Sequence, residues 1–370
     1  MAYTTIDDPE VYFQVVTWNG NAGTNAVTFG GETDMQPDLI WGKDLSGDRH
    51  FLADAVRGKT GTGYYLLASN NNESDTSNAP PDGITSIDSN GFTLGANTSN
   101  TNGGWSYEIN EDKDNGQGNS GKYVAWCWKA GTSFSNDASA TSVGSIDSTG
   151  SINTTAGFSI IGYTGNATDE ATVAHGLSAV PKVIIFKNRS SAEHWRFHTT
   201  IVDGSYDLLY PNLTNAKGDS SITAPTSSVF SLDEYTEDNG SGNSIITYCF
   251  APKQGFSKFG SYTGNGDADG TFVFCGFRPA FVMVKRTDST ADWHIQDIKR
   301  DTYNPADTSL FADTTDEDTT SSTYETDFLS NGFKLRGTTT ARNGSGATYI
   351  YMAFAEAPFV NSNGVPCNAR

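Results

Sequence analysis

The sequence repeats one long block three times, and each copy carries the same landmarks in the same order. A turn that ends in Gly-Asn comes first, a strand that runs from Pro to Lys follows, and an alternating aromatic strand closes the block. A repeat of this kind indicates that each copy forms one structural unit. The turns are residues 18–21, 163–166 and 262–265, the Pro-to-Lys segments are 37–43, 181–187 and 279–285, and the closing strands are 124–128, 246–250 and 350–354.

The spacing inside the copies aligns individual residues. Pro and Lys stand six positions apart in every copy, and an aromatic residue follows each Lys by eight positions. We therefore expect large buried aromatic side chains at matching places in the three units. The predicted equivalent sets are Phe51, Trp195 and Trp293 after the Lys, and Trp128, Phe250 and Phe354 at the end of the closing strand.

The periodicity within the landmarks predicts β-strands. In one closing strand Ile246, Tyr248 and Phe250 alternate with smaller residues, which indicates one bulky buried face. Segments 183–186 and 281–284 are apolar on both faces, so we expect central strands that are covered twice. With 39 Gly and a hydrophobic fraction of 36%, the composition favours short strands joined by polar turns. The sequence predicts an all-β chain of three tandem antiparallel β-sandwich domains.

The landmarks also set the expected boundaries. The first sandwich repeat spans residues 1–130, the second 157–254 and the third 255–360, and a tail follows at 361–370. Residues 131–156 are rich in Ser, Thr, Asn and Asp without apolar periodicity, which predicts a polar linker.

Charge and cysteine usage limit the partners and the compartment. A net charge of −20 disfavours nucleic acid, because phosphates repel a polyanion. The sequence contains no run of eighteen apolar residues, so it predicts no membrane span. The N-terminus has no basic region and no apolar core, so we do not expect a secretory signal. The four cysteines have no short paired spacing, which predicts reduced thiols in a protein made in a cytoplasm. They are Cys127, Cys249, Cys275 and Cys367.

Several longer motifs resemble a repeat family common in marine tailed bacteriophages. The motifs are the opening Met-Ala-Tyr-Thr-Thr-Ile-Asp-Asp-Pro, the Ala-His-Gly-Leu at 174–177, the Gly-Phe-Ser-Lys-Phe-Gly-Ser-Tyr-Thr-Gly-Asn-Gly at 255–266, the Gly-Phe-Arg-Pro at 276–279 and the ending at 349–359. The resemblance covers nearly the whole chain. It implies a virion, tail-fibre or appendage protein with lectin-like, concanavalin-like jelly-roll domains, and it supplies no catalytic residues.

The first copy departs from this pattern. Its turn begins with Trp18 instead of Tyr, and an insertion precedes its closing strand. We therefore expect the first copy to have its own task, such as docking to the particle.

The strongest candidate for catalysis is a pair of carboxylates in the third copy. Glu325 and Asp327 resemble the acid motif of lectin-like glycan hydrolases, but Ser330 stands where the second catalytic Glu should be. A glycosidase needs two positioned carboxyl groups. The sequence therefore predicts no enzyme activity and no catalytic residue.

Metal-site candidates are also incomplete. His194 and His198 stand four apart after a strand without a third ligand, and Asp267 begins a calcium-like loop that has Arg278 at its twelfth position. The acidic segment 313–318 could bind a cation, but a solvated loop is the simpler interpretation. Because Trp195 and Trp293 recur at one repeat position, a core role is favoured over a sugar platform. We predict no metal and no cofactor.

These observations predict a structural protein of a bacteriophage virion, made in the host cytoplasm and most consistent with a tail fibre or appendage for host attachment. A capsid-surface fibre or decoration protein is the first alternative, and a free carbohydrate-binding or glycan-hydrolysing protein is the second. The expected partners are other virion proteins and a host-surface glycan or protein. Because 183–186 and 281–284 need covering on two faces, we expect a homo-oligomer, with a trimer as first choice. A monomer whose three domains cover one another is the competing account.

Overall fold

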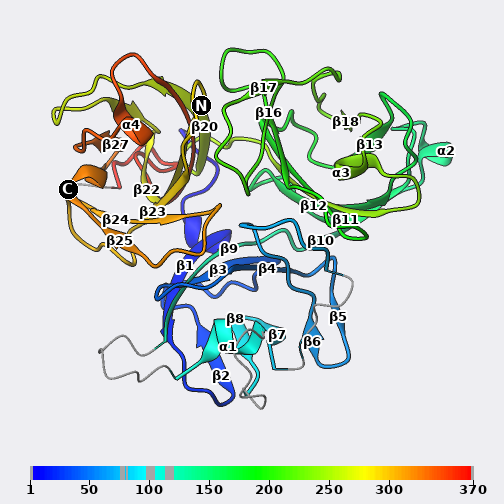
Figure 1. The fold of residues 1–370 in the computed structure, drawn as a ribbon, viewed down its shortest axis with the longest axis horizontal. Helices are drawn as coiled ribbons and strands as arrows, with labels where there is room; N and C mark the ends of the chain where they lie inside the picture. Colours follow the sequence, from blue (N-terminus) through cyan, green and yellow to red (C-terminus); the bar gives the residue numbers. More distant parts are fainter. Residues whose placement is uncertain (1–2, 76–79, 81, 97–104, 113–120, 368–370) are drawn as a thin grey trace.

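Three β-rich units surround a common centre (Figure 1). The computed structural model describes residues 3–75, 80, 82–96, 105–112 and 121–367. Strands dominate the described residues and the sheets are antiparallel, so the expected all-β sandwich class is confirmed. We call residues 3–130 unit 1, residues 131–254 unit 2 and residues 255–360 unit 3.

Each unit has a main sheet that faces the other units and smaller strands on its outer side. The elements of unit 1 are η1 (Pro9–Val11), β1 (Phe13–Asn19), β2 (Asn25–Thr28), β3 (Leu39–Asp44), β4 (His50–Asp54), β5 (Lys59–Thr60), β6 (Gly63–Tyr64), β7 (Ile84–Asp88), β8 (Gly91–Leu94), α1 (Trp105–Asn110) and β9 (Lys122–Trp128). Its main sheet has the order β1-β9-β3-β4, and β2-β8-β7 form the outer sheet.

Unit 2 has the largest main sheet, in the order β10-β11-β12-β19-β14-β15-β16-β17, with β13 and β18 paired outside it. Its elements are β10 (Thr132–Asn136), α2 (Ala138–Thr141), β11 (Ser148–Asn153), β12 (Phe158–Thr164), β13 (Thr172–Ala174), β14 (Val183–Asn188), β15 (Arg196–Thr199), β16 (Asp207–Leu209), β17 (Gly218–Asp219), β18 (Val229–Ser231), α3 (Thr236–Asn239) and β19 (Ser244–Phe250).

Unit 3 repeats the plan with the main sheet β20-β28-β22-β23-β24-β25 and the outer sheet β21-β27-β26. Its elements are β20 (Ser257–Thr263), β21 (Phe272–Phe274), β22 (Phe277–Arg286), β23 (Trp293–Asp297), β24 (Thr308–Phe311), β25 (Thr319–Thr320), η2 (Ser322–Tyr324), β26 (Thr326–Leu329), β27 (Gly332–Leu335), α4 (Thr340–Asn343) and β28 (Thr348–Pro358).

Strand register makes the three copies equivalent residue by residue. The landmark lysines Lys43, Lys187 and Lys285 pair with Val124, Ile246 and Ile350, which are the matching positions of the closing strands. The residues that we align below are those that occupy the same place in these ladders.

One core lies between the units, separate from the core inside each sandwich. Trp128, Phe250 and Phe354 meet there, with ring centroids 6.2 Å, 5.4 Å and 5.8 Å apart in the three pairings. Each of these rings lies four residues after the position that pairs with the landmark lysine, so the expected equivalence of the three is confirmed. We call this shared cluster the central core.

The strands that are apolar on both faces are covered within one chain. In β14, Val183 and Ile185 face the central core, while Ile184 and Phe186 face the core of unit 2. The strand β22 alternates in the same way. The burial that motivated a second chain is therefore supplied by neighbouring units, and a homotrimer stays a prediction without support from these strands.

Residues 131–156 correct the predicted linker. They form β10, α2 and β11. In the main sheet of unit 2, β11 pairs with β12 and β10 forms the edge beyond it. An edge of a sheet can carry polar residues because one side of it is solvated, so the apolar periodicity that we required was too strict. Gly150 permits the close pairing, since a Cβ there would lie 2.0 Å from the backbone oxygen of Ile160.

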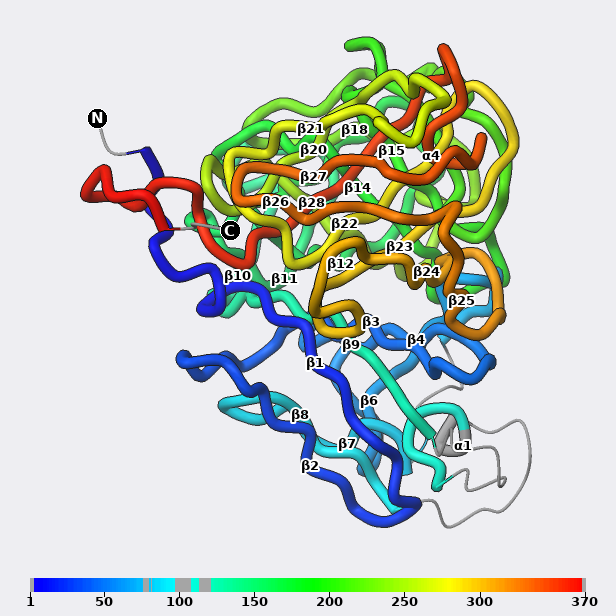
Figure 2. The backbone as a smooth tube through the Cα atoms, turned by 90° about the vertical axis from the view of Figure 1, so that its left-hand side faces the viewer, coloured from blue at the N-terminus to red at the C-terminus, as the bar shows by residue number. Residues whose placement is uncertain are grey.

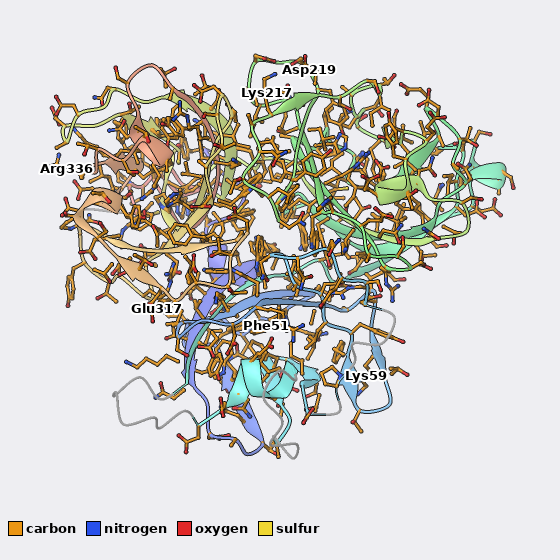
Figure 3. The ribbon with its side chains drawn as sticks, in the orientation of Figure 1. Phe51, Lys59, Lys217, Asp219, Glu317 and Arg336 are labelled. Carbon is orange, nitrogen blue, oxygen red and sulfur yellow. The ribbon has the colours of Figure 1, made fainter. Side chains whose placement is uncertain are left out.

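The aromatic predicted after the first Lys is displaced by one residue. Trp293 pairs with Lys285, and Trp195 directly precedes β15, where the same register continues toward Lys187. Both rings lie in the central core, but His50 pairs with Lys43. Phe51 instead lies in the core of unit 1, on the side of its sheet away from the other units (Figure 3). The loop before β4 is one residue shorter, and a shift of one position moves a side chain to the opposite face of a strand.

The described N-terminal segment and the C-terminal tail lie on the same side of the molecule in Figure 2 and contact each other. The Tyr3 hydroxyl donates to the Gly276 oxygen, and Asp7 accepts hydrogen bonds from Ser362 in the C-terminal tail. The insertion before β9 contains α1, while residues 97–104 and 113–120 lie outside the described residues. The described N-terminal segment thus ties unit 1 to unit 3.

Replacement of a central-core aromatic tests this arrangement. Trp293 is 1% exposed, and we expect Trp293→Ala to lower the free energy of unfolding by about 3–5 kcal/mol, because a large cavity opens in the shared core. Chemical denaturation measures the change. Phe272→Ala is the matched control, since Phe272 is 43% exposed in the same unit and its removal should change stability by less than about 1 kcal/mol. Equal effects of the two variants would contradict a shared core.

Candidate functional site

The landmark lysines hold the units together. Each side chain is buried and donates hydrogen bonds to backbone oxygens of its own unit and of the next one. Burial lowers the pKa of each amine to about 8. The contacts across the seams are Lys43 to the Thr315 oxygen (3.2 Å), Lys187 to the Asn72 oxygen (2.9 Å) and Lys285 to the Thr214 oxygen (2.9 Å).

The ring next to each lysine crosses the same seam. Trp195 donates to the Ala68 oxygen at 2.8 Å and Trp293 donates to the Tyr210 oxygen at 3.0 Å. His50 does the same in unit 1, where Nε2 lies 2.8 Å from the Phe311 oxygen and Nδ1 accepts from Trp41. The contacts run from unit 2 to unit 1, from unit 3 to unit 2 and from unit 1 to unit 3, so they form a closed cycle.

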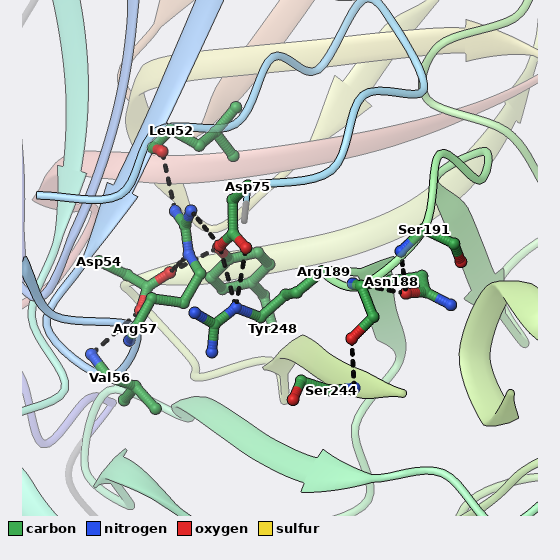
Figure 4. A network of polar contacts seen from close by, with 11 residues as sticks. Leu52, Asp54, Val56, Arg57, Asp75, Asn188, Arg189, Ser191, Ser244 and Tyr248 are labelled. Carbon is green, nitrogen blue, oxygen red and sulfur yellow. Dashed lines mark hydrogen bonds and ion pairs between the residues drawn. The ribbon is translucent and has the colours of Figure 1, made fainter. Parts of the chain in front are cut away.

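A buried carboxylate reinforces two of the seams. Asp54 accepts from Arg57 of its own turn and from the Tyr248 hydroxyl of unit 2 at 2.8 Å (Figure 4). In unit 3, Asp297 accepts from Arg300 and from Trp126 of unit 1 at 3.1 Å. At the third seam the matching positions are Thr199 and Met352, so acceptor and donor are absent together.

The Gly-Asn turns also have a packing role. A buried Asn from the short helix before each closing strand accepts from the backbone of the turn, as Asn239 Oδ1 does from Asn166 N at 2.9 Å. Asn343 and Asn110 repeat this contact in units 3 and 1. A Cβ at Gly165 would lie 2.5 Å from the Gly240 oxygen, which explains the invariant Gly. Our sequence reasoning missed these three Asn residues, although the Asn-Gly steps at 239–240 and 343–344 were a usable signal.

Unit 2 contains a buried cluster of ionisable groups in its sandwich core. Arg196 contacts Asp233, lies 3.3 Å from Asp238 Oδ1 and 3.4 Å from Glu237 Oε2. Burial raises the pKa of Asp238, and the nearby Asp233 raises it further against the influence of Arg196. Burial lowers the pKa of His198 to about 3, and neither of its ring nitrogens has a hydrogen-bond partner among the described residues.

A protonated buried carboxyl next to an ionised one is a pattern seen in acid catalysis. The repeat argues for packing instead. The pair formed by Arg196 and Asp238 corresponds to His294 and Arg342 in unit 3 and to the apolar Phe51 and Ile109 in unit 1. Asp238 is also 0% exposed, whereas a catalytic acid must reach its substrate. The cluster therefore occupies core positions whose chemistry differs between units.

The predicted catalytic candidates are not brought together into a site. Asp327 lies in β26 of the outer sheet with its carboxylate 3.4 Å from Arg336 Nε, and Glu325 precedes that strand. Ser330 stands at the β26–β27 turn. The structure thus places one carboxylate in an ion pair and offers no second one at the expected position.

The metal candidates are likewise separated. His194 contacts Asn212, while His198 lies between Phe186 and Tyr206 inside unit 2. Among the described residues no group of three His, Cys, Asp or Glu side chains could hold a metal ion. In the same part of the chain no helix is long and apolar enough to cross a membrane.

The two acidic segments serve as local turns and straps. Asp267 accepts from the Asp269 amide, and Asp269 pairs with Lys334, while Arg278 pairs with Glu356. The segment 313–318 lies at the seam with unit 1. There Asp313 accepts from the Trp293 amide at 2.9 Å, and burial raises the pKa of this carboxyl to about 6.

In the described part of the chain, two larger surface grooves are candidate binding sites, one at the unit 1–unit 2 seam and one at the unit 3–unit 1 seam. Their volumes are about 450 Å³ and 440 Å³. The groove at the unit 1–unit 2 seam is lined by β12, by the start of β19 and by the turn at residues 54–57 of unit 1. The groove at the unit 3–unit 1 seam is lined by the matching elements, which are β1, the start of β9 and the turn at residues 297–300 of unit 3. No landmark in the sequence pointed to them, because each needs residues from two units.

A family model described as a domain of unknown function (DUF7483) matches residues 8–358. No curated protein and no solved structure matches the chain. The matched span runs through all three units, so the domain of this family corresponds to the complete three-unit body and not to one repeat.

The unsatisfied imidazoles predict a pH effect on stability. Burial lowers the pKa of His294 far below 6.5, and the charges of Arg342 and Lys285 lower it further. Below pH 6.5 the unfolded chain therefore binds a proton at this imidazole that the folded chain does not bind. The free energy of unfolding decreases as the pH is lowered through this range. The ring of His294 aligns with Phe51, so we expect His294→Phe to remove this loss, which amounts to about 2 kcal/mol at pH 5 relative to pH 8.

Denaturation of both proteins at several pH values measures the difference. His294→Gln is the control for packing, because it also cannot titrate and should show the same pH-dependent gain with a different stability at pH 8. An identical pH profile for wild type and both variants would show that His294 does not titrate on unfolding.

Proposed function

The chain belongs to the DUF7483 family, and we propose that it is a non-enzymatic structural protein of a bacteriophage virion, part of a tail fibre or appendage that attaches to the host surface. The observation that supports this proposal is the use of every recurring landmark for packing. The lysines, the adjacent rings and the Gly-Asn turns all join units or close strands, and none gathers into a reactive group. A body of three packed units, each with outer strands directed away from the common centre, suits a structural or adhesive role.

The thiols agree with assembly in a reducing host cytoplasm. Cys127, Cys249 and Cys275 are buried and free, and each lies in the sandwich core of a different unit. Burial raises the pKa of each of these thiols, which keeps them protonated and unreactive. The motifs shared with marine phage repeats support the same proposal. A capsid-surface fibre or decoration protein would use the same properties.

Location on the particle tests the proposal. Mass spectrometry of purified particles of the phage that encodes this chain should find its peptides in a fixed ratio to a known virion protein. Immunogold labelling should then place it on the tail. Labelling of the head would favour the decoration alternative, and absence of the peptides from washed particles would refute a structural role.

Catalysis is tested separately. We expect the purified chain to release no reducing ends from host polysaccharide, because Asp327 is held by Arg336 and a second positioned carboxyl is absent at Ser330. Turnover that Glu325→Gln abolishes, with the fold unchanged by circular dichroism, would replace the structural proposal with a hydrolytic one. Turnover that survives in Glu325→Gln would point to a contaminant.

A further inference from the structure

We call the groove at the unit 3–unit 1 seam the basic groove. It is lined by Arg300, whose equivalent at the unit 1–unit 2 seam, Arg57, has all of its contacts supplied by the chain. Arg57 of unit 1 makes three contacts: Nε to Asp54, Nη2 to the Leu52 oxygen and Nη1 to Asp75 at 3.2 Å. Arg300 of unit 3 repeats the first two contacts, with Asp297 at 2.7 Å and the Ile295 oxygen at 3.0 Å. Its Nη1 is buried and has no hydrogen-bond partner in the described part of the chain.

The missing partner has an identifiable cause. At the unit 1–unit 2 seam, the carboxylate of Asp75 pairs with Arg57 and also with Arg189 of unit 2, whose Nε lies 2.9 Å away (Figure 4). Arg189 thus helps to hold Asp75 beside Arg57. The residue that matches Asp75 is Asp318. Asp75 follows Leu67 by eight positions and Asp318 follows Leu310 by eight, and these two leucines pair with equivalent residues of their units. Asp318 N donates to the Leu45 oxygen at the seam. At the unit 3–unit 1 seam, Leu45 occupies the position of Arg189 and cannot form an ion pair with Asp318. Among the described contacts, Asp318 forms no ion pair with Arg300 within 4 Å.

The walls of the basic groove differ from those of the matching groove in charge. Lys122 and Lys299 line it together with Arg300, against the single carboxylate of Asp318. The matching positions in the other groove are Ser244 and Val56, and that groove is lined by Asp137 and Asp147 with Arg189. In a chain with a net charge of −20, this seam therefore carries two lysines at positions that are neutral in its counterpart, beside an arginine that both seams share.

The remaining lining suits a polyhydroxylated ligand. Thr17, Asn19 and Thr308 offer hydroxyl and amide groups, and the half-buried ring of Trp18 forms part of the wall. The Arg300 side chain is only 3% exposed, so a ligand reaching Nη1 would form a partly desolvated, charge-assisted hydrogen bond. A volume of about 440 Å³ is in the range of small-ligand sites and holds one or two sugar rings.

We propose that the basic groove binds an acidic saccharide, with the sugar carboxylate on Arg300 Nη1 between Lys122 and Lys299 and sugar hydroxyls donating to Asp318. The chain itself supplies the precedent for the anion, because a carboxylate occupies the corresponding arginine nitrogen at the unit 1–unit 2 seam. The inference rests on the proposed attachment function and assigns it a ligand class.

Binding of digalacturonate to the full chain tests the proposal by isothermal titration calorimetry at low salt. We expect saturable binding that weakens as salt is added, since exposed charges are screened. The variant Lys122→Ser with Lys299→Val installs the residues of the matching groove, and both side chains are exposed, so the protein should fold normally. This variant should bind at least about tenfold more weakly.

Three further variants sharpen the result. Arg300→Lys keeps a charge but loses the free nitrogen of the guanidinium, and it should weaken binding while thermal unfolding reports any loss of structure. Asp318→Asn removes the like charge facing the ligand carboxylate but keeps a side-chain oxygen that accepts from sugar hydroxyls, so it should strengthen binding. Lys59→Ser is the control, because it removes one exposed lysine from the β5–β6 hairpin and should not change the affinity. Figure 3 shows Lys59 on the other side of unit 1 from Glu317, the residue before Asp318.

Competing ligands decide the class. Equal binding of neutral digalactose, tighter binding of inorganic phosphate or a hexaglutamate peptide, or no binding of digalacturonate at millimolar concentration would each overturn the proposal. An unchanged affinity in the Lys122→Ser, Lys299→Val variant would also overturn it. None of these outcomes bears on whether the chain is present in virions, so the ligand and the virion role fail independently.

Discussion

The contact of Trp128, Phe250 and Phe354 is the constraint on which the rest of the structure depends. Three sheets can bring these rings within 6.2 Å of one another only if all three direct one face toward a common centre. The central strands of every main sheet are then buried on both sides, by the outer strands of their own unit and by the two neighbouring units. The apolar runs in β14 and β22 follow from this geometry, because strands with two buried faces have no solvated positions.

The seams show how such a core can be closed without exposing backbone polar groups. Loops at the rim of each unit would leave carbonyl oxygens buried against the next unit, and the landmark lysine and the adjacent ring donate to those oxygens. A buried amine is costly unless its hydrogen bonds are made, so each lysine requires the loop of the next unit to be in place. The three units are thereby coupled in one direction around the cycle.

Equivalent positions have diverged in matched sets. Tyr248 with Asp54 and Trp126 with Asp297 bond across two seams, while Met352 and Thr199 leave the third seam without this bond. Inside the sandwiches, a pair of ionisable residues in units 2 and 3 replaces an apolar pair in unit 1. For the pairs that bond across the seams, losing one member would leave a buried group unsatisfied, so both members change together. The basic groove is the exception. Arg300 is kept as the equivalent of Arg57, but Leu45 replaces the arginine that holds the carboxylate in place at the other seam.

The sequence by itself determined the triplication, the strand class, the placement of the closing strands and the burial of Trp195 and Trp293, since these depend on local periodicity and on spacing within one copy. Spacing failed at Phe51, where a loop one residue shorter shifted the strand, and at residues 131–156, where a polar edge strand has no apolar signature. Only the tertiary structure decided that the units share one core and that His50 takes the place of the two tryptophans. It alone brought Lys122, Arg300 and Asp318 to one groove. Those relations join residues from different copies, and no pattern within a copy records which face of one sheet meets the rim of another.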